Sequence, residues 1–388
     1  MREKNEVVPV AFYYALIYMG HAGVVSYIGL YYSSLGLDTV RIGLISASGS
    51  LLGIIARPVW GSISDRSESK NRILRHVLFM SAVTIWFVPL SGKSFWFIVI
   101  SISVFNFFYN SAIPLGDSIV LEISKTGNNF KYSSVRTIGS VGYAVMSAVY
   151  GKLFSIDIKY IFVAFSSLWL FSFIVSFMIP EVKGHSIGHN DVGFHELFKD
   201  KRLTYIYIYV FLLSCTLGYF YSFHAIYSKS LGISTQFIGI GVMVGSFSQF
   251  PFMLLFDKLY KRFGIINIML ISGTAFVIRW IMMSTVLSEK TIIFIWLIHG
   301  LNTIVLHFCL AEYVASNVPK ALRTRGQVAN SIIVSGISAI MGSSIGGVIS
   351  SVIGMSNTFS AFSAVCVLAV VGLIITAKFT DMKFDKTQ

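Results

Sequence analysis

The sequence predicts an all-α membrane protein in which twelve transmembrane helices form two pseudo-symmetric six-helix bundles. Three observations lead to this prediction: the composition, the long runs without charge, and a repeat between the two halves. Hydrophobic residues make up 55% of the 388 residues and charged residues only 12%, against about 25% in soluble domains. A water-soluble fold of this composition would expose large apolar patches, so the lipid bilayer is the expected solvent.

The uncharged runs locate the helices. Asp, Glu, Lys and Arg are absent from residues 7–37, 94–116, 160–180, 203–228, 230–256, 291–311 and 326–377. A spanning helix needs about 20 apolar residues, so the last run holds two helices joined by a turn at 354–360. We predict helices at 9–34, 39–63, 74–91, 94–122, 134–155, 158–179, 203–229, 235–257, 264–286, 291–316, 326–351 and 356–378.

The longest polar break divides the chain into domains. Residues 180–202 are polar and charged, and we assign them to a cytoplasmic linker. Residues 1–179 then form an N-terminal six-helix bundle. Residues 203–388 form a C-terminal six-helix bundle with a short cytoplasmic tail.

Lysine and arginine set the orientation of the helices. If the N-terminus is cytoplasmic, 23 of the 30 basic residues fall on the cytoplasmic side, six fall in outer loops, and Arg279 lies within a helix. We therefore expect both termini in the cytoplasm and the protein in the cytoplasmic membrane of the cell. This bias explains the net charge of +13. No nucleic-acid partner is expected, because no basic face is concentrated on a soluble domain.

The two halves share an internal repeat. Residues 26–50 and 222–246 match at a fixed offset of 196 residues, with ten of 25 positions identical. Both segments run from the end of a half's first helix into its second helix, in the same direction. A parallel repeat of this kind is typical of transporters built from two bundles.

A charged loop follows the second helix. Gly61, Asp65 and Arg66 are followed by Lys70 and Arg72 in the sequence GSISDRSESKNR. This order resembles the loop signature of the major facilitator superfamily, which has a glycine, three residues, Asp-Arg, a spacer, a second glycine and basic residues. Serine and glutamate stand here where the second glycine is usual. The resemblance extends over the twelve helices and the repeat, and it implies the major facilitator fold.

We assign Gly61, Asp65 and Arg66 to a conformational latch. Gly61 is expected to let the second helix approach a neighbour closely. Asp65 opposes the dipole at a helix C-terminus, so it should find a partner across the seam between the halves in one conformation and lose it in another. The alternative is that this loop is only a positively charged cytoplasmic anchor.

An acid and a base on consecutive helices form the first candidate site. Asp117 lies toward the cytoplasmic end of the fourth helix and Arg136 opens the fifth, so they should lie at similar depth, with Tyr143 on the same helical face as Arg136. Such a set suits a polar ring such as a sugar. The stretch also resembles the lactose-permease and phenylpropionate-permease branch of the superfamily, which has an acid and an arginine at matching places; the tryptophan usual after that arginine is missing. A structural ion pair is the alternative.

Ionisable groups on the tenth helix form the second candidate site. His299, His307 and Glu312 follow one another along it, and Arg279 should lie at a depth close to that of His299. The His-Gly pair followed by a second histidine again resembles the phenylpropionate-permease branch. We predict that these three residues, with Glu122 on the fourth helix, couple transport to protons, since intramembrane groups of this kind mark proton relays. A histidine that only joins two helices by a hydrogen bond is the alternative.

Two aromatic positions complete the predicted substrate ligands. His21 lies near the middle of the first helix, and Tyr219 lies on the repeat-equivalent seventh helix. Both helices should border a central cavity. For the aromatic residues of this seventh helix, a belt at the outer membrane interface is the alternative.

Together these features predict a secondary active transporter that moves a small polar organic solute by alternating access. We expect proton-coupled uptake of a sugar, nucleoside or organic acid; the alternative is drug or metabolite efflux by proton antiport. The sequence contains no HExxH, Walker or nucleophile-elbow motif, so we expect no enzyme activity. We expect no metal and no cofactor apart from the coupling proton, and a monomer whose partners are the solute and the bilayer.

Overall fold

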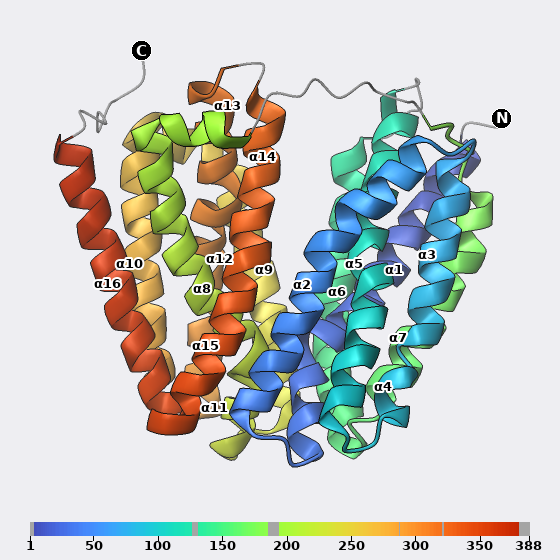
Figure 1. Ribbon diagram of the computed structural model, residues 1–388, viewed down its shortest axis with the longest axis horizontal. Coiled ribbons are helices and arrows are strands. Elements are labelled where there is room, and N and C mark those ends of the chain that lie inside the picture. The colour runs from blue at the N-terminus through green and yellow to red at the C-terminus, as the bar shows by residue number, and fades with distance from the viewer. Residues whose placement is uncertain (1–3, 126–130, 185–193, 287, 320–321, 380–388) are drawn as a thin grey trace. The chain divides into compact units, whose positions relative to one another are not determined.

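The computed structural model describes residues 4–125, 131–184, 194–286, 288–319 and 322–379. These residues are helical, with short turns and no strands among them. The chain divides into two compact units, Met1–His189 and Asn190–Gln388, and each is described by itself. In both units the long helices run side by side (Figure 1).

The first unit contains six long helices. Its elements are α1 (Lys4–Ser34), α2 (Thr39–Asp65), α3 (Lys70–Thr84), α4 (Phe87–Leu90), α5 (Phe95–Lys125), α6 (Tyr132–Ile156), α7 (Tyr160–Val175) and the 3-10 turn η1 (Ser176–Met178). The single turn α4 continues α3, so the two together make the third membrane helix.

The second unit also contains six long helices, two of which are interrupted by π-helical segments. Its elements are the 3-10 helix η2 (Phe194–Lys199), α8 (Lys201–Ser230), α9 (Thr235–Phe263), α10 (Ile265–Ser284), α11 (Glu289–Leu297), α12 (His299–Thr303), π-helix η3 (Ile304–Cys309), α13 (Leu310–Asn317), α14 (Arg323–Ile332), π-helix η5 (Ile333–Ile337), α15 (Ser338–Ile353) and α16 (Met355–Phe379). The run from α11 to α13 is the fourth helix of this unit, and α14 with α15 is the fifth.

The helices are built to cross a bilayer. Eleven of the described helical stretches are long and apolar enough to do so. The twelfth is α6, which has 25 residues but carries Arg136, Lys152 and several serines, and these lower its mean hydropathy. The all-α prediction of twelve transmembrane helices is confirmed.

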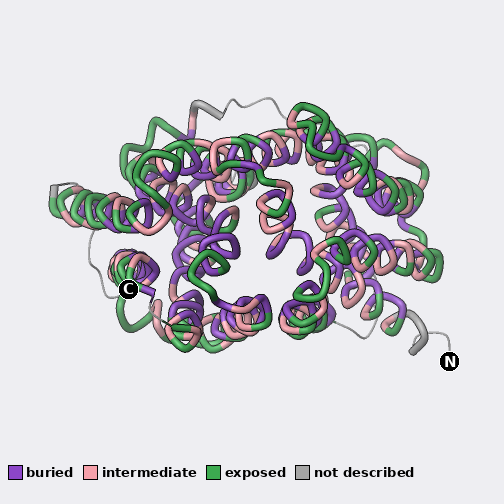
Figure 2. The backbone as a smooth tube through the Cα atoms, turned by 90° about the horizontal axis from the view of Figure 1, so that it is seen from below, coloured by how far each residue is buried: buried purple, intermediate pink, exposed green. Residues whose placement is uncertain are grey.

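The two units repeat one packing pattern. The first helix packs against the fifth and sixth, as α1 does on α6 and α7 and α8 does on α15 and α16. The second helix packs on the fourth and the third on the sixth, in both units. Buried residues lie on the helix faces turned toward the other helices of the same unit (Figure 2). The repeat detected in the sequence is therefore a repeat of structure.

The repeated sequence forms the same turn in both units, between the first and second helices. Gly36 and Gly232 have φ of 82° and 79°, a left-handed conformation that glycine adopts most easily. The residue after each glycine donates to the carbonyl five positions earlier, at 3.4 and 3.1 Å, as in a Schellman motif. Asp38 and Ser234 then cap the next helix through their side chains.

The stretch predicted as a linker is partly structured. Residues 179–184 follow η1 without regular secondary structure, η2 is helical, and α8 begins at Lys201. Residues 185–193 lie outside the described residues. The division into units falls within the predicted linker.

Candidate substrate and proton-coupling sites

The first unit brings Asp117 and Arg136 together. Asp117 lies on α5 and Arg136 on α6, and Arg136 Nε is 3.9 Å from Asp117 Oδ1. The hydroxyl of Tyr14 on α1 donates to the same carboxylate oxygen at 2.7 Å. Both charged side chains are partly exposed, 24% for Asp117 and 35% for Arg136. The acid and base lie at similar depth, as their places on consecutive helices predict.

Tyrosines of α1 surround this ion pair. The guanidinium of Arg136 lies 4.4 Å from the ring centroid of Tyr18, within the range of a cation–π contact. Its Nη1 is buried and has no hydrogen-bond partner among the described residues. The prediction of an aromatic residue beside the arginine named Tyr143; the ring that covers it is Tyr18. Tyr14, Tyr18 and His21 follow each other at helical spacing, and this was the signal that could have identified them.

His21 and Tyr143 extend this strip. Their ring centroids are 5.9 Å apart, and His21 lies 6.0 Å from Tyr18. His21 Nδ1 is hydrogen-bonded to the Tyr109 hydroxyl of α5, and the Tyr143 hydroxyl is 3.3 Å from Ser26 Oγ. The predicted ligands Asp117, Arg136, His21 and Tyr143 therefore lie along one polar and aromatic strip of the first unit.

A second cluster surrounds Arg279 in the other unit. Arg279 on α10 is 0% exposed, and its Nη1 lies 2.8 Å from His299 Nδ1 and 3.1 Å from Asn302 Oδ1. A guanidinium can only donate, so His299 Nδ1 accepts and the ring proton sits on Nε2. That nitrogen is 3.4 Å from the hydroxyl of Tyr221 on α8, which is 38% exposed. A hydrogen-bonded chain thus leads from an exposed phenol to a buried cation.

Three aromatic rings enclose this cation. Its guanidinium carbon lies 4.3 Å from the ring centroid of Phe220, 5.1 Å from Trp280 and 5.3 Å from Trp296. Cation–π contacts of this kind strengthen when water is excluded. The depth match predicted between Arg279 and His299 is met, whereas Asn302 was not identified from the sequence.

Other predicted proton-coupling residues lie apart from this cluster. His307 lies on π-helix η3 and is exposed. Glu312, on α13, accepts a hydrogen bond from Ser316 Oγ at 2.6 Å. Glu122 lies in the first unit, where Lys70 Nζ is 3.2 Å away. Of these four residues, His299 is hydrogen-bonded to Arg279.

Tyr219 occupies a packed position. It is 0% exposed, its hydroxyl is 2.5 Å from Ser350 Oγ, and Phe223, Phe359 and Phe362 surround its ring. Substrate contact by Tyr219 stays a prediction. The geometry favours a role in joining α8 to α15 and α16.

The charged loop between α2 and α3 is held within its own unit. Lys70 Nζ lies 3.4 Å from Asp65 Oδ1 and 3.2 Å from Glu122 Oε2, so one buried ammonium bridges the loop to α5. Arg66 is exposed at the C-terminal end of α2. A Cβ added to Gly61 would meet no atom within 4 Å, so the close approach expected there is absent among the described residues. The latch role of these residues remains a prediction.

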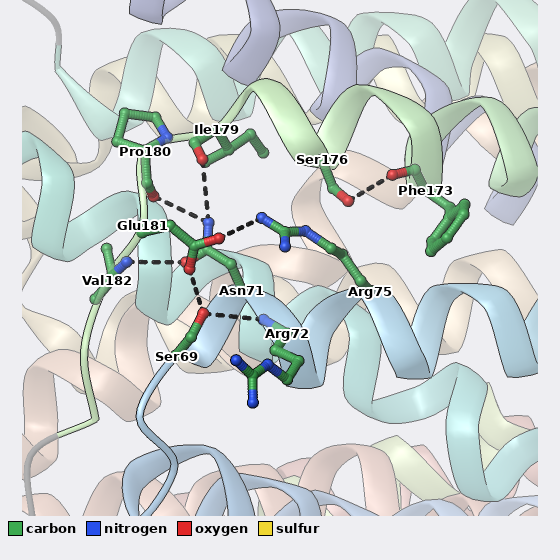
Figure 3. A network of polar contacts seen from close by, with 10 residues as sticks. All are labelled: Ser69, Asn71, Arg72, Arg75, Phe173, Ser176, Ile179, Pro180, Glu181 and Val182. Carbon is green, nitrogen blue, oxygen red and sulfur yellow. Dashed lines mark hydrogen bonds and ion pairs between the residues drawn. The ribbon is translucent and has the colours of Figure 1, made fainter.

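The chain after α7 is tied to this loop through Asn71 (Figure 3). Asn71 Nδ2 donates to the carbonyls of Pro180 at 2.9 Å and Ile179 at 3.3 Å, and Oδ1 accepts from Val182 N at 3.0 Å. The amide of Lys70 donates to Val182 O at 2.8 Å. We call residues 179–184 the strap.

Glu181 adds a charged tie to the strap. Arg75 Nη2 lies 2.5 Å from Glu181 Oε1, and Ser69 Oγ donates to the other carboxylate oxygen (Figure 3). Partial burial raises the pKa of Glu181, but the hydrogen bonds from Ser69 and Arg75 together with the positive charges of Arg75 and Arg72 outweigh it, so the pKa lies below its usual value. The strap and its charge were not identified from the sequence.

Comparison with known proteins fits this architecture. The profile of the MFS_1 like family matches residues 8–362. The chain belongs to the MFS_1 like family. It is a multi-pass membrane protein and a secondary transporter of the major facilitator superfamily, not an enzyme.

Relatives and solved structures agree with this assignment. The chain is 24% identical over 294 residues to the uncharacterized transporter YwbF of Bacillus subtilis (strain 168), covering 74% of this chain and 71% of YwbF. It is 26% identical to the probable 3-phenylpropionic acid transporter of Escherichia coli (strain K12), covering 79% and 82% of the two chains. The crystal structure of nucleoside transporter NupG matches with a TM-score of 0.85 at 16% identity, covering 96% of this chain and 99% of NupG.

Proposed function

We propose that this MFS_1 like transporter takes up a small polar organic solute together with protons. The sugar, nucleoside and organic-acid classes remain the candidates. The protein acts in the cytoplasmic membrane as a monomer, with both termini in the cytoplasm and with the proton as its only cofactor. The observation that carries this proposal is the Asp117–Arg136 pair, set among tyrosine rings and partly exposed.

This strip has the chemistry to bind a polar ring. A carboxylate accepts hydrogen bonds from hydroxyl groups, and the guanidinium donates to them with directional N–H groups. The unpartnered Nη1 of Arg136 supplies one such donor. Tyrosine rings offer faces for stacking and hydroxyls for polar contacts. The name of a relative, probable 3-phenylpropionic acid transporter, supports a substrate of this size.

His299 is the proposed proton carrier. Its Nδ1 accepts from Arg279 and its Nε2 faces Tyr221, so a second proton on the ring must displace the guanidinium. Protonation therefore changes the contacts of Arg279, which links proton binding to a rearrangement of this cluster. His307, Glu312 and Glu122 stay in the proposal as secondary candidates.

The test uses purified protein in liposomes with an imposed pH gradient and a panel of sugars, nucleosides and organic acids. Substrate-dependent proton entry is expected for one class. Proton movement in the direction opposite to that of the solute would instead establish antiport and efflux. His299→Gln should keep solute exchange without a gradient and lose uphill accumulation, because glutamine accepts from Arg279 but does not titrate. Uphill accumulation that survives in His299→Gln would remove this residue from the coupling.

A further inference from the structure

The second unit contains a buried cation without an acid. Arg279 is 0% exposed, and the structure records no ion pair for it among the described residues. The described acids of this unit are engaged or exposed elsewhere, at Glu196, Asp200, Asp257, Glu289 and Glu312. Burying a charge is costly unless an opposite charge or full hydrogen bonding compensates it.

One edge of the guanidinium is unused. Nη1 is taken by His299 and Asn302. Nε and Nη2 have no hydrogen-bond partner among the described residues, and the same holds for Asn302 Nδ2. Nε and Nη2 form the side of the guanidinium whose two parallel N–H groups match the two oxygens of a carboxylate. Two neighbouring buried side chains therefore carry three unpartnered donors, and donors are what an anion requires.

Nearby contacts fix the orientation of this edge. Asn302 is 0% exposed and His299 is 3% exposed, so both hold Nη1 from buried positions. The rings of Phe220, Trp280 and Trp296 restrict the guanidinium plane. A guanidinium restrained in this way loses little conformational freedom when it binds a ligand.

We propose that the Nε–Nη2 edge of Arg279, with Asn302 Nδ2, binds a carboxylate of the transported solute. This inference rests on the proposed function and narrows its substrate class to organic acids. Arg279 is closed off in the present structure, so the carboxylate reaches it through the movements of alternating access. The solute supplies the negative charge that the second unit does not place beside Arg279.

Matched pairs of probes test this inference without a pH gradient. Each carboxylate is compared with a neutral partner: 3-phenylpropionate with its amide, butyrate with its amide, and galacturonate with galactose. Binding to the detergent-solubilised full chain is followed by thermal shift and by tryptophan fluorescence, because Trp280 and Trp296 adjoin the site. At least one carboxylate should bind more tightly than its partner by about tenfold or more, the effect of one charged hydrogen-bonding contact.

Variants assign this preference to Arg279. Arg279→Gln should abolish the difference between the carboxylate and its neutral partner, and Arg279→Lys should retain part of it, since lysine keeps the charge and loses the paired donors. Arg41→Gln is the control, because Arg41 is exposed and forms an ion pair with Asp38. Arg279→Lys keeps the test open should the glutamine variant fail to fold.

Three outcomes overturn the inference. In the first, the neutral probes bind as tightly as every carboxylate. In the second, the preference for the carboxylate survives in Arg279→Gln. In the third, chloride at equal concentration raises the unfolding temperature as much as the acids do, which would identify an inorganic-anion site. The proposed function fails separately. A carboxylate that binds through Arg279 but drives no proton flux would overturn proton-coupled transport alone, and proton-coupled uptake of galactose unaffected by Arg279→Gln would overturn the carboxylate alone.

Discussion

Each unit places an arginine against aromatic side chains, and the charge of that arginine is compensated differently in the two units. Arg136 shares its environment with Asp117 and remains 35% exposed. Arg279 is 0% exposed and has His299 and Asn302 where an acid would be expected. The first cluster is neutral by itself, whereas the second carries a positive charge. A repeat that preserves helix packing has therefore left the polar chemistry of the two units free to diverge.

The loops between the second and third helices differ in the same way. In the first unit α2 and α3 are separated by residues 66–69, and the strap holds this loop. In the second unit Gly264 alone separates α9 from α10, with a φ of 72°. The four-residue loop is joined to the strap, because the Gly184 amide donates to Ser67 O at 3.1 Å and Ser69 Oγ donates to the Glu181 carboxylate.

The largest expected effect is that of Asp117→Asn on solute affinity, because this variant removes the acid that distinguishes the first cluster from the second. Asp117→Asn keeps an acceptor for Tyr14 but leaves Arg136 without its acid. Solute affinity should fall roughly 10–100-fold, since hydrogen bonds to charged groups contribute about 1.5–3 kcal/mol. Equilibrium binding of the transported solute measures this change.

Asp38→Asn is the matched control for this experiment, because Asp38 is exposed and asparagine also caps helices. Unchanged affinity in Asp117→Asn would show that the pair is structural, which is the alternative that the sequence left open.

The second effect concerns the strap. Asn71→Ala removes the partners of two carbonyls and one amide, and the free energy of unfolding should fall by about 1–3 kcal/mol. Unfolding by SDS in mixed micelles measures it. Asn267→Ala is the control at the start of α10, where the side chain is partly exposed and donates to the Phe263 carbonyl at the end of α9, at 2.7 Å. Equal losses for both variants would contradict a special role for the strap.

A third test concerns what the two units share. Gly36→Ala and Gly232→Ala should each cost about 1–2 kcal/mol, because a Cβ is disfavoured at left-handed φ. The same SDS unfolding assay applies. The two turns have the same geometry, so the costs should agree within about 0.5 kcal/mol and should add in the double variant. Clearly unequal costs would show that the turns, too, have diverged.

The smallest effect is pH-dependent. The folded-state pKa of Glu181 is lowered, so its ties stabilise the first unit above the usual carboxyl pKa of about 4.3 and are lost as the pH falls below it. At pH 7 the free energy of unfolding of the wild type should exceed that of Glu181→Gln by less than about 1 kcal/mol, because the Glu181 side chain is 54% exposed. Thermal unfolding at several pH values should show the difference shrinking toward pH 4. A constant difference would mean that charge is not its source.

The sequence predicted the helices well, because bilayer thickness fixes their length and charges mark their ends. Asp117 and Arg136 could be paired from helix direction alone. Tyr14 and Tyr18 were missed, because a tyrosine within an apolar run cannot be told from an ordinary apolar residue of a membrane helix until its partners are known. The strap was missed because Asn71 binds main-chain groups more than 100 residues away, and no local pattern encodes such a contact.

Other features of the structure could not be read from the sequence, each for its own physical reason. Gly61 has open space beside it within its unit, so small size alone did not identify a close contact. Tyr219 satisfies its hydroxyl with Ser350, a partner that is 131 residues distant. The π-helical segments η3 and η5 lie in uncharged runs where hydropathy gives no sign of a change in helical winding.

Those two segments give the second unit a form of joint that the described part of the first lacks. A π turn contains one extra residue. If the π turn moved to another position along the helix, the helical segment between the two positions would rotate by about 100° about its axis. We expect α13 and α14 to rotate during transport, while the corresponding ends of α5 and α6 move as rigid rods. Cysteine labelling along residues 310–317 and 118–125, with and without solute, would reveal a change of exposed face in the first set alone. Transport would then combine a rotation of helix ends in the second unit with a rigid movement of the corresponding helices in the first.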